Sequence, residues 1–242
     1  MTPLSILIVG LLLGITHATE ADHLAAVATL ATRQNSLAQT LRQGVAWGVG
    51  HSLTLMLFGG LVFALGQAIP EGLEKALETA VGAMLVLLGA DVLRRLARER
   101  IHFHVHRHAA ETAHVHAHSH RSEASPHAES AHDHAHAPKR WPLRALAVGM
   151  MHGLAGSAAL IVLSLQSAPS LPIGLGYIAL FGVGSIAGMA LLSVAIAVPL
   201  KLSAGYLAGL HPSMTALVGA FSIALGGWMI IEIGYLRGLL FA

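Results

Sequence analysis

The sequence predicts an all-α polytopic membrane protein: six transmembrane helices, arranged as a 3+3 inverted repeat, with a cytoplasmic histidine-rich loop between the repeats. Three observations predict this architecture. Of the 242 residues, 55% are hydrophobic and 11% are charged, and the mean hydropathy of +0.67 lies outside the range of ordinary soluble domains. Six apolar stretches are long enough to cross a bilayer, which takes about 20 residues. Short glycine motifs also recur in the same order in both halves of the chain.

Turn and interface signals separate the six stretches. The first is followed by Arg33-Gln34-Asn35-Ser36 and the second by Pro70-Glu71-Gly72, which favour turns. Trp141 precedes the fourth, where an aromatic residue suits the membrane interface. No basic residue precedes Arg33, so we interpret the first stretch as a membrane span and not as a signal peptide. The predicted spans are residues 4–30, 43–66, 76–96, 142–166, 172–200 and 213–236.

Three motifs of the first half have counterparts in the second half at nearly constant offsets. The pairs are Gly14-Ile15-Thr16-His17 with Gly149-Met150-Met151-His152, Gly48-Val49-Gly50-His51 with Gly182-Val183-Gly184-Ser185, and Val81-Gly82-Ala83 with Val218-Gly219-Ala220. Their offsets are 135, 134 and 137 residues. Because each repeat contains an odd number of spans, the second copy must face the opposite way, as in transporters whose substrate site lies at the repeat interface. We therefore predict transmembrane repeat 1 at 1–100, a disordered loop at 101–140 and transmembrane repeat 2 at 141–242.

The distribution of basic residues predicts the orientation in the cytoplasmic (inner) membrane. Twelve of the fourteen Lys and Arg residues flank the connections after the first, third and fifth spans, and only Lys75 and Arg237 lie on the other side. The positive-inside rule then places both termini outside and the histidine-rich loop in the cytoplasm. The net charge of +2 gives no support to nucleic-acid binding. The absence of cysteine excludes disulfides and thiolate metal sites within this chain.

Four ionisable residues lie close together in the first span, where each is costly in a bilayer. On a continuous helix His17, Glu20 and His23 fall within an arc of about 120° and can face one cavity. Asp22 lies about 100° away from that arc. Either Asp22 orients a histidine from the side, or the helix is locally broken and Asp22 also turns inward.

Two further histidines lie at a similar depth in other spans. His51 is in the second span beside Ser52, and His152 in the fourth is the repeat counterpart of His17, with Ser157 further along. Imidazole and carboxylate groups together suit a divalent ion of the nickel, cobalt or zinc type. We predict a shared metal site, supported by the two serines, whose ligands come from His17, Glu20, Asp22, His23, His51 and His152.

The connection from Ile101 to Pro138 contains twelve of the seventeen histidines. Histidine-rich tracts bind divalent metals, and this segment is too polar to fold around a core. We therefore predict accessory metal binding by the alternating histidines, namely His102, His104, His106, His108, His114, His116, His118, His120, His132, His134 and His136.

The first two spans resemble the nickel/cobalt transporter family. The family's signature of a histidine, four residues and Asp-His is similar to His17-Ala18-Thr19-Glu20-Ala21-Asp22-His23, and its second motif to Gly50-His51-Ser52. The resemblance is nearest to the compact permeases associated with urease and hydrogenase genes. It implies metal recognition by His17, Asp22 and His23, with His51 contributing. Glu20 stands where the family usually has Asp, and residues 152–157 stand where larger members have Phe-Asp-Thr.

These features together predict a secondary transporter that carries Ni²⁺ or Co²⁺ inward as its substrate and has no prosthetic group. Nickel or cobalt efflux stays open, because a cytoplasmic histidine loop fits both directions. An exporter of small organic solutes on the same fold would leave that loop unexplained. No HExxH or GxxxxGK(S/T) motif is present, so we predict neither an enzyme nor an ATP-driven pump. The expected partners are the metal ion, the lipid bilayer and a cytoplasmic metallochaperone; the sequence does not indicate an oligomeric state.

Overall fold

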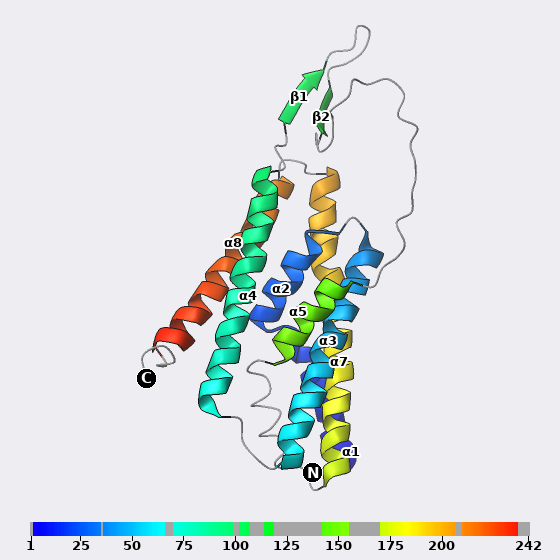
Figure 1. The fold of residues 1–242 in the computed structure, drawn as a ribbon. Coiled ribbons are helices and arrows are strands. Elements are labelled where there is room, and N and C mark those ends of the chain that lie inside the picture. The colour runs from blue at the N-terminus through cyan, green and yellow to red at the C-terminus, as the bar shows by residue number, and fades with distance from the viewer. Residues whose placement is uncertain are drawn as a thin grey trace.

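The computed structural model describes residues 2–34, 36–65, 70–98, 102–106, 114–118, 142–154, 170–206 and 210–236. These residues form a bundle of helices and one short hairpin (Figure 1). The elements are α1 (Pro3–His17), α2 (Ala21–Ala31), α3 (Leu37–Leu65), α4 (Glu71–Arg98), β1 (His102–His106), β2 (His114–His118), α5 (Leu143–Gly153), α7 (Leu171–Tyr206), α8 (Leu210–Met229) and the π-helix η1 (Ile230–Leu236).

The chain is a multi-pass membrane protein. In the described part, four helical stretches are long and apolar enough to cross a bilayer: α3, α4, α7, and α8 extended into η1. The pair α1 and α2 makes a fifth when it is taken as one bent span. Helix α5 begins the predicted span 142–166, but residues 155–169 lie outside the described residues, so the sixth span stays a prediction.

The predicted first span is not one continuous helix. Helix α1 ends at His17, α2 begins at Ala21, and the two axes differ by 56°. The amide nitrogens of Thr19 and Glu20 bond to carbonyls three residues back, a tighter turn that commonly ends a helix. Glu20 then takes the extended conformation of an N-cap, with ψ of 149°. The expectation of a single helix over 4–30 was therefore wrong at this turn.

The helices pack in a pattern that links the two halves of the chain. Helices α3 and α7 lie along each other, α1 packs on α7, and α5 packs on α3. On the other side of the bundle α4 packs on α8, with α2 and α5 drawn between the two pairs in Figure 1. The helix that begins each half, α1 or α5, therefore packs on the second long span of the other half, α7 or α3.

Glycine allows the helix backbones to approach closely at these crossings. A Cβ on Gly14 of α1 would overlap the carbonyl of Phe181 in α7, and a Cβ on Gly149 of α5 would overlap the carbonyl of Trp47 in α3. Such small residues are typical of contacts between membrane helices, where close van der Waals packing drives association.

Glycines also allow close approach where α4 crosses α8. Gly82 lies against the carbonyl of Gly226, and Gly89 lies against the carbonyl of Gly219. The two helices thus touch backbone to backbone at two levels.

The histidine-rich connection contains the two strands. Strands β1 and β2 pair antiparallel, with His102 opposite His118 and His106 opposite His114. This hairpin adds a short β element to the predicted all-α fold. The prediction that the whole of 101–140 is a disordered loop stays a prediction for the residues outside the described ranges.

One carboxylate joins three elements at the end of the bundle where α2 ends and α4 ends. Asp91 of α4 pairs with Arg33, which follows α2, and its oxygens lie 3.1 Å from Arg94 and 3.6 Å from Arg144 at the start of α5. Arg95 lies 3.5 Å away. The side chain of Asp91 is only 17% exposed, so this cluster ties the ends of α2, α4 and α5 together.

Candidate metal centre

The break between α1 and α2 positions the polar side chains of the first span. His17 is the last residue of α1, and Asp22 lies in the first turn of α2, where a negative charge interacts favourably with the helix N-terminus. Because the chain bends here, Asp22 turns toward the histidines and is not directed away from them. The structure thus agrees with the broken-helix alternative for Asp22.

Glu20 fixes the ring of His17. The His17 Nδ1 lies 2.7 Å from Glu20 Oε1, and a carboxylate can only accept a hydrogen bond, so Nδ1 is the donor. The Nε2 of His17 is buried and has no hydrogen-bond partner among the described residues. Glu20 itself is 50% exposed, so it connects the buried ring to the surface of the protein.

Asp22 holds two histidines from different halves of the chain. Its Oδ1 accepts from the backbone nitrogen of His23 at 2.8 Å and lies 2.9 Å from the ring Nδ1 of His23. Its Oδ2 lies 2.9 Å from the Nε2 of His152 on α5. The His23 Nε2 and the His152 Nδ1 are buried without a hydrogen-bond partner in the described part of the chain.

The carboxylate contacts leave one nitrogen of each of these imidazoles free to bind a metal ion. A histidine that donates one N–H to a carboxylate presents a lone pair on its other nitrogen, which is the usual arrangement around bound metal ions. His17, His23 and His152 all have this arrangement. In His51, which is fully buried, both ring nitrogens lack a partner among the described residues.

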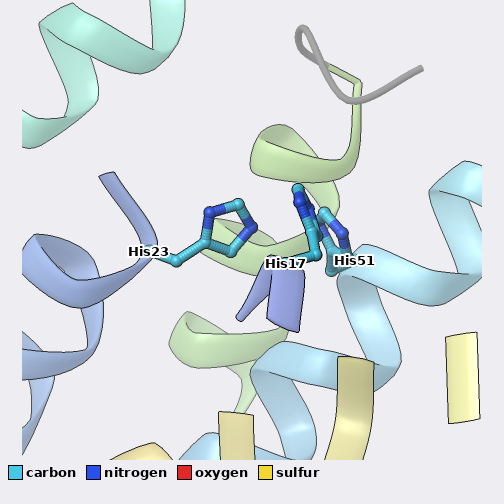
Figure 2. A group of neighbouring side chains, drawn as sticks. All are labelled: His17, His23 and His51. Carbon is cyan, nitrogen blue, oxygen red and sulfur yellow. The ribbon is translucent and has the colours of Figure 1, made fainter. Parts of the chain in front are cut away.

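His17, His23 and His51 form the first of two compact groups. One nitrogen of each lies within 4.8 Å of the others. The rings of His17 and His51 stack at a centroid distance of 5.2 Å, and His23 meets His17 edge-on at 4.3 Å. Figure 2 shows His17 and His51 side by side, with His23 facing them from α2.

Asp22, His23 and His152 form the second group, with ligand atoms within 4.8 Å of one another. The rings of His23 and His152 are 4.1 Å apart. His23 therefore belongs to both groups. Spacing of this size can close around an ion such as Ni²⁺, Co²⁺ or Zn²⁺, which bind imidazole nitrogen and carboxylate oxygen.

Of the two serines predicted to support the metal site, the structure describes only Ser52. The hydroxyl of Ser52 donates to the carbonyl of Gly182 at 3.0 Å, so its described hydrogen bond joins α3 to α7 and does not reach a histidine. Ser157 lies outside the described residues. The side chains of the histidines in the loop, from His102 to His136, also lie outside the described part of the structure.

Two aromatic residues that the sequence did not identify contact the histidines. The ring of Trp47 lies 5.4 Å from that of His23 and 5.5 Å from that of His152. The ring of Phe181 lies 5.3 Å from that of His17. The repeat offset of 134 residues relates Trp47 to Phe181, and this was the signal that could have identified the pair.

A comparison with curated proteins identifies one relative. Over 183 residues, covering 75% of this chain and 72% of the relative, the sequence is 33% identical to the urease accessory protein UreH of Bacillus sp. (strain TB-90). No family model matches the chain, and the comparison with solved structures found no match.

The similarity extends the resemblance well beyond the two motifs of the first two spans. This chain is a transporter and not an enzyme. By its sequence over three quarters of its length, the protein belongs to the nickel/cobalt transporter family, in the compact type associated with urease.

Proposed function

We propose that this protein transports Ni²⁺ inward across the cytoplasmic membrane, with Co²⁺ as a second substrate, and that the ion binds at the histidines between α1, α2, α3 and α5. One observation carries the proposal. One ring nitrogen of each of His17, His23 and His51 lies within 4.8 Å of the others inside apolar helices, and each ring has a buried nitrogen without a hydrogen-bond partner among the described residues. Buried polar groups in a bilayer require partners, and a divalent ion supplies one to all three rings.

In this proposal the carboxylates prepare the ligands. Glu20 and Asp22 accept the N–H groups of His17 and His23, which orients the rings and raises the basicity of the nitrogens that face the ion. Their negative charges also offset the charge of a divalent cation in a region of low dielectric constant. His152 completes the site from the second half of the chain.

The overlap of the two groups suggests how the ion moves. His23 can hold the ion while His17 and His51 are exchanged for Asp22 and His152, since all of these residues lie next to the His23 ring. An ion that keeps one ligand while it changes the others is never released into the apolar part of the bundle. Transport requires ligands that also let go, and this exchange meets the requirement.

We propose that the chain is built as two inverted repeats of three spans. The contacts support this: Gly14 lies on Phe181, and the counterparts Gly149 and Trp47 make the same contact. In the same way the contact of Gly82 with Gly226 corresponds to that of Gly219 with Gly89. Equivalent residues making equivalent contacts are the expected sign of an internal two-fold relation.

We propose that both termini are outside and that the histidine-rich connection is in the cytoplasm. The basic residues Arg33, Arg94, Arg95 and Arg144 gather at one end of the bundle, which the positive-inside rule assigns to the cytoplasm. The histidines after α4 would then receive the ion as it leaves the membrane and present it to a metallochaperone.

The inward direction rests on the relative. The name of the relative connects it to urease, and a metal transporter that serves an enzyme inside the cell would carry the metal inward. Deleting the gene should therefore lower the nickel content of cells grown in limiting nickel. A rise in nickel content, with nickel sensitivity, would instead identify an efflux permease.

The test of the site is uptake of radioactive nickel into cells or liposomes that contain the purified protein. His17→Ala, His23→Ala and His51→Ala should each reduce uptake about 10- to 100-fold, as expected for loss of a metal ligand or its close support. His211→Ala is the matched control, because His211 bonds to Ser203 and the Leu200 carbonyl outside this site. Uptake at the normal rate by the His17→Ala and His23→Ala variants would contradict the proposed mechanism.

A further inference from the structure

The cluster at Asp91 brings arginines from three parts of the chain to one end of the bundle. Arg33 follows α2, Arg94 and Arg95 lie in the last two turns of α4, and Arg144 lies in the first turn of α5. Four positive charges therefore surround one negative charge, which gives these five residues a net charge of +3. A surface of this charge attracts anions.

One carboxylate cannot accept from all the donors around it. The Oδ2 of Asp91 pairs with Arg33, while Arg95 and Arg144 lie 3.5 and 3.6 Å from the same oxygen, at or beyond the limit of a hydrogen bond. Each guanidinium has five N–H donors and no acceptor, whereas a carboxylate has about four acceptor positions. The cluster at Asp91 thus offers more donors than Asp91 can use.

The arginines are also close enough to repel one another. Burial, and after it the charges of Arg144, Arg95 and Arg94, lower the pKa of Arg33 to about 10. An anion beside these groups offsets the repulsion, and a guanidinium binds a phosphate through two parallel hydrogen bonds. The chemistry of the cluster at Asp91 therefore favours a phosphate group as its ligand.

Two of the arginines are accessible from outside the bundle. The side chain of Arg94 is 63% exposed and that of Arg144 is 50% exposed, although the Asp91 carboxylate that they share is only 17% exposed. Their guanidinium groups are therefore open to a ligand at the surface, whereas Asp91 is screened from it.

An apolar face of α4 leads along the membrane span to Arg94. Ala83, Leu87 and Ala90 are exposed, as Arg94 is, and their helical spacing places all four on one side of the helix. Leu87 is 71% exposed and lies about 10 Å before Arg94 along the axis, since each residue of a helix rises about 1.5 Å. A lipid with its phosphate at Arg94 therefore has apolar surface for its chains.

We propose that the cluster at Asp91 binds the phosphate of an anionic phospholipid in the leaflet at this end of the bundle, with the chains of the lipid along the exposed face of α4. Basic groups between membrane helices are suited to acidic headgroups. A headgroup without a cationic amine fits, because the net positive charge of the cluster repels an amine. The inference requires only that the chain lies in a bilayer, so it does not depend on nickel transport.

The test is a titration of the purified protein in detergent with phosphatidylglycerol, which is anionic, and separately with phosphatidylethanolamine, which carries an amine. Native mass spectrometry measures the dissociation constant of the first bound lipid. The unaltered protein should bind phosphatidylglycerol more tightly than phosphatidylethanolamine. Replacing both accessible arginines, with Arg94→Gln and Arg144→Gln in one chain, should weaken phosphatidylglycerol binding about 30-fold, roughly fivefold for each arginine.

Lys201→Gln is the matched control. It removes one positive charge near the end of α7, at the same end of the bundle (Figure 1) but outside the contacts described for the cluster at Asp91. This variant should bind phosphatidylglycerol as the unaltered protein does. Equal affinity of the unaltered protein for the two lipids, or unchanged affinity of the double variant for phosphatidylglycerol, would overturn the proposal. The comparison of the two lipids on the unaltered protein decides the matter even if the double variant does not fold.

Thermal unfolding separates a lipid from a soluble anion. Phosphatidylglycerol should raise the unfolding midpoint of the unaltered protein and of Lys201→Gln, because a ligand that binds only the folded state stabilises it, and it should not raise that of the double variant. Inorganic phosphate, which has no chains to place on α4, should change the midpoint much less. An equal rise with inorganic phosphate would show that the ligand is a soluble anion and that the lipid proposal is wrong.

Discussion

His23 is the residue on which the geometry of the metal centre most depends. Its ring lies 4.1 Å from that of His152, 4.3 Å from that of His17 and 5.3 Å from that of His51. Asp22, the preceding residue, fixes it through both the backbone nitrogen and the ring. A single carboxylate therefore sets the orientation of the central ring and ties it to α5.

Asp22 should matter more to metal binding than Glu20. Asp22→Asn places an amide N–H₂ or a weaker acceptor against His23 and His152, and we expect nickel affinity to fall about 10- to 100-fold. Glu20→Gln disturbs only His17, from a half-exposed position, and should have a smaller effect. Calorimetric titration of the two variants with Ni²⁺ measures the difference; equal affinities would contradict the assigned roles.

The sequence predicted which side chains meet, but not how they meet. His17, His23, His51 and His152 were expected to converge because ionisable groups in a bilayer require partners, and the structure brings them together. The contact of Asp22 with His152 depends on the bend between α1 and α2. Periodicity assumes a continuous helix, so it placed Asp22 about 100° away from the site.

At the scale of elements, the position of Asp22 left a break in the first span open as one alternative, but the hydropathy of the span did not indicate it. The apolar residues after His23 continue the hydropathy of α1, and nothing in a window average reveals the turn at Thr19 and Glu20. At this turn the hydroxyl of Thr19 also bonds to the carbonyl of Thr16 at 2.6 Å, but threonines in the unbroken helices α3 and α4 make similar bonds, so this contact does not by itself explain the break. Spans without such a break, α3 and α4, were predicted to within several residues.

The crossing of α5 over α3 should be sensitive to one methyl group. In Gly149→Ala the new Cβ meets the carbonyl of Trp47, and overpacking of this kind costs about 1–3 kcal/mol. Gly227→Ala on α8 is the control, because nothing lies within 4 Å of its Cβ position. Thermal unfolding in detergent should show a lower midpoint for Gly149→Ala alone. Equal midpoints would mean that this crossing can relax.

The histidine-rich connection should bind metal but not be required for transport. It lies outside the membrane spans, and in its described part the two histidine-bearing strands pair with each other. Replacing residues 101–138 by a flexible linker of equal length should lower the number of Ni²⁺ ions bound per chain while uptake continues. Metal analysis of the purified proteins and an uptake assay test both parts. Complete loss of uptake in a variant that inserts normally would place the connection on the ion path.

At the scale of the whole molecule, the cluster at Asp91 holds together elements from both halves of the chain. Asp91→Asn would leave Arg33, Arg94, Arg95 and Arg144 without their shared carboxylate. We expect a loss of stability of about 1–3 kcal/mol, less than for a fully buried pair because Arg94 and Arg144 are half exposed or more. Glu71→Gln removes an exposed ion pair with Lys75 and should change the unfolding midpoint little. A similar midpoint for both would contradict a structural role for the cluster.

The packing pattern also constrains how the protein is made. Helix α1 packs on α7, which is complete only at Tyr206, and α3 packs on α5. During synthesis the first three spans therefore enter the bilayer before their surfaces that contact α5, α7 and α8 are covered, and Asp22 can meet His152 only after α5 has been made. Neither half can complete its own folding, so two separately expressed halves, 1–100 and 141–242, should be degraded when made alone and protect each other from proteolysis when made together.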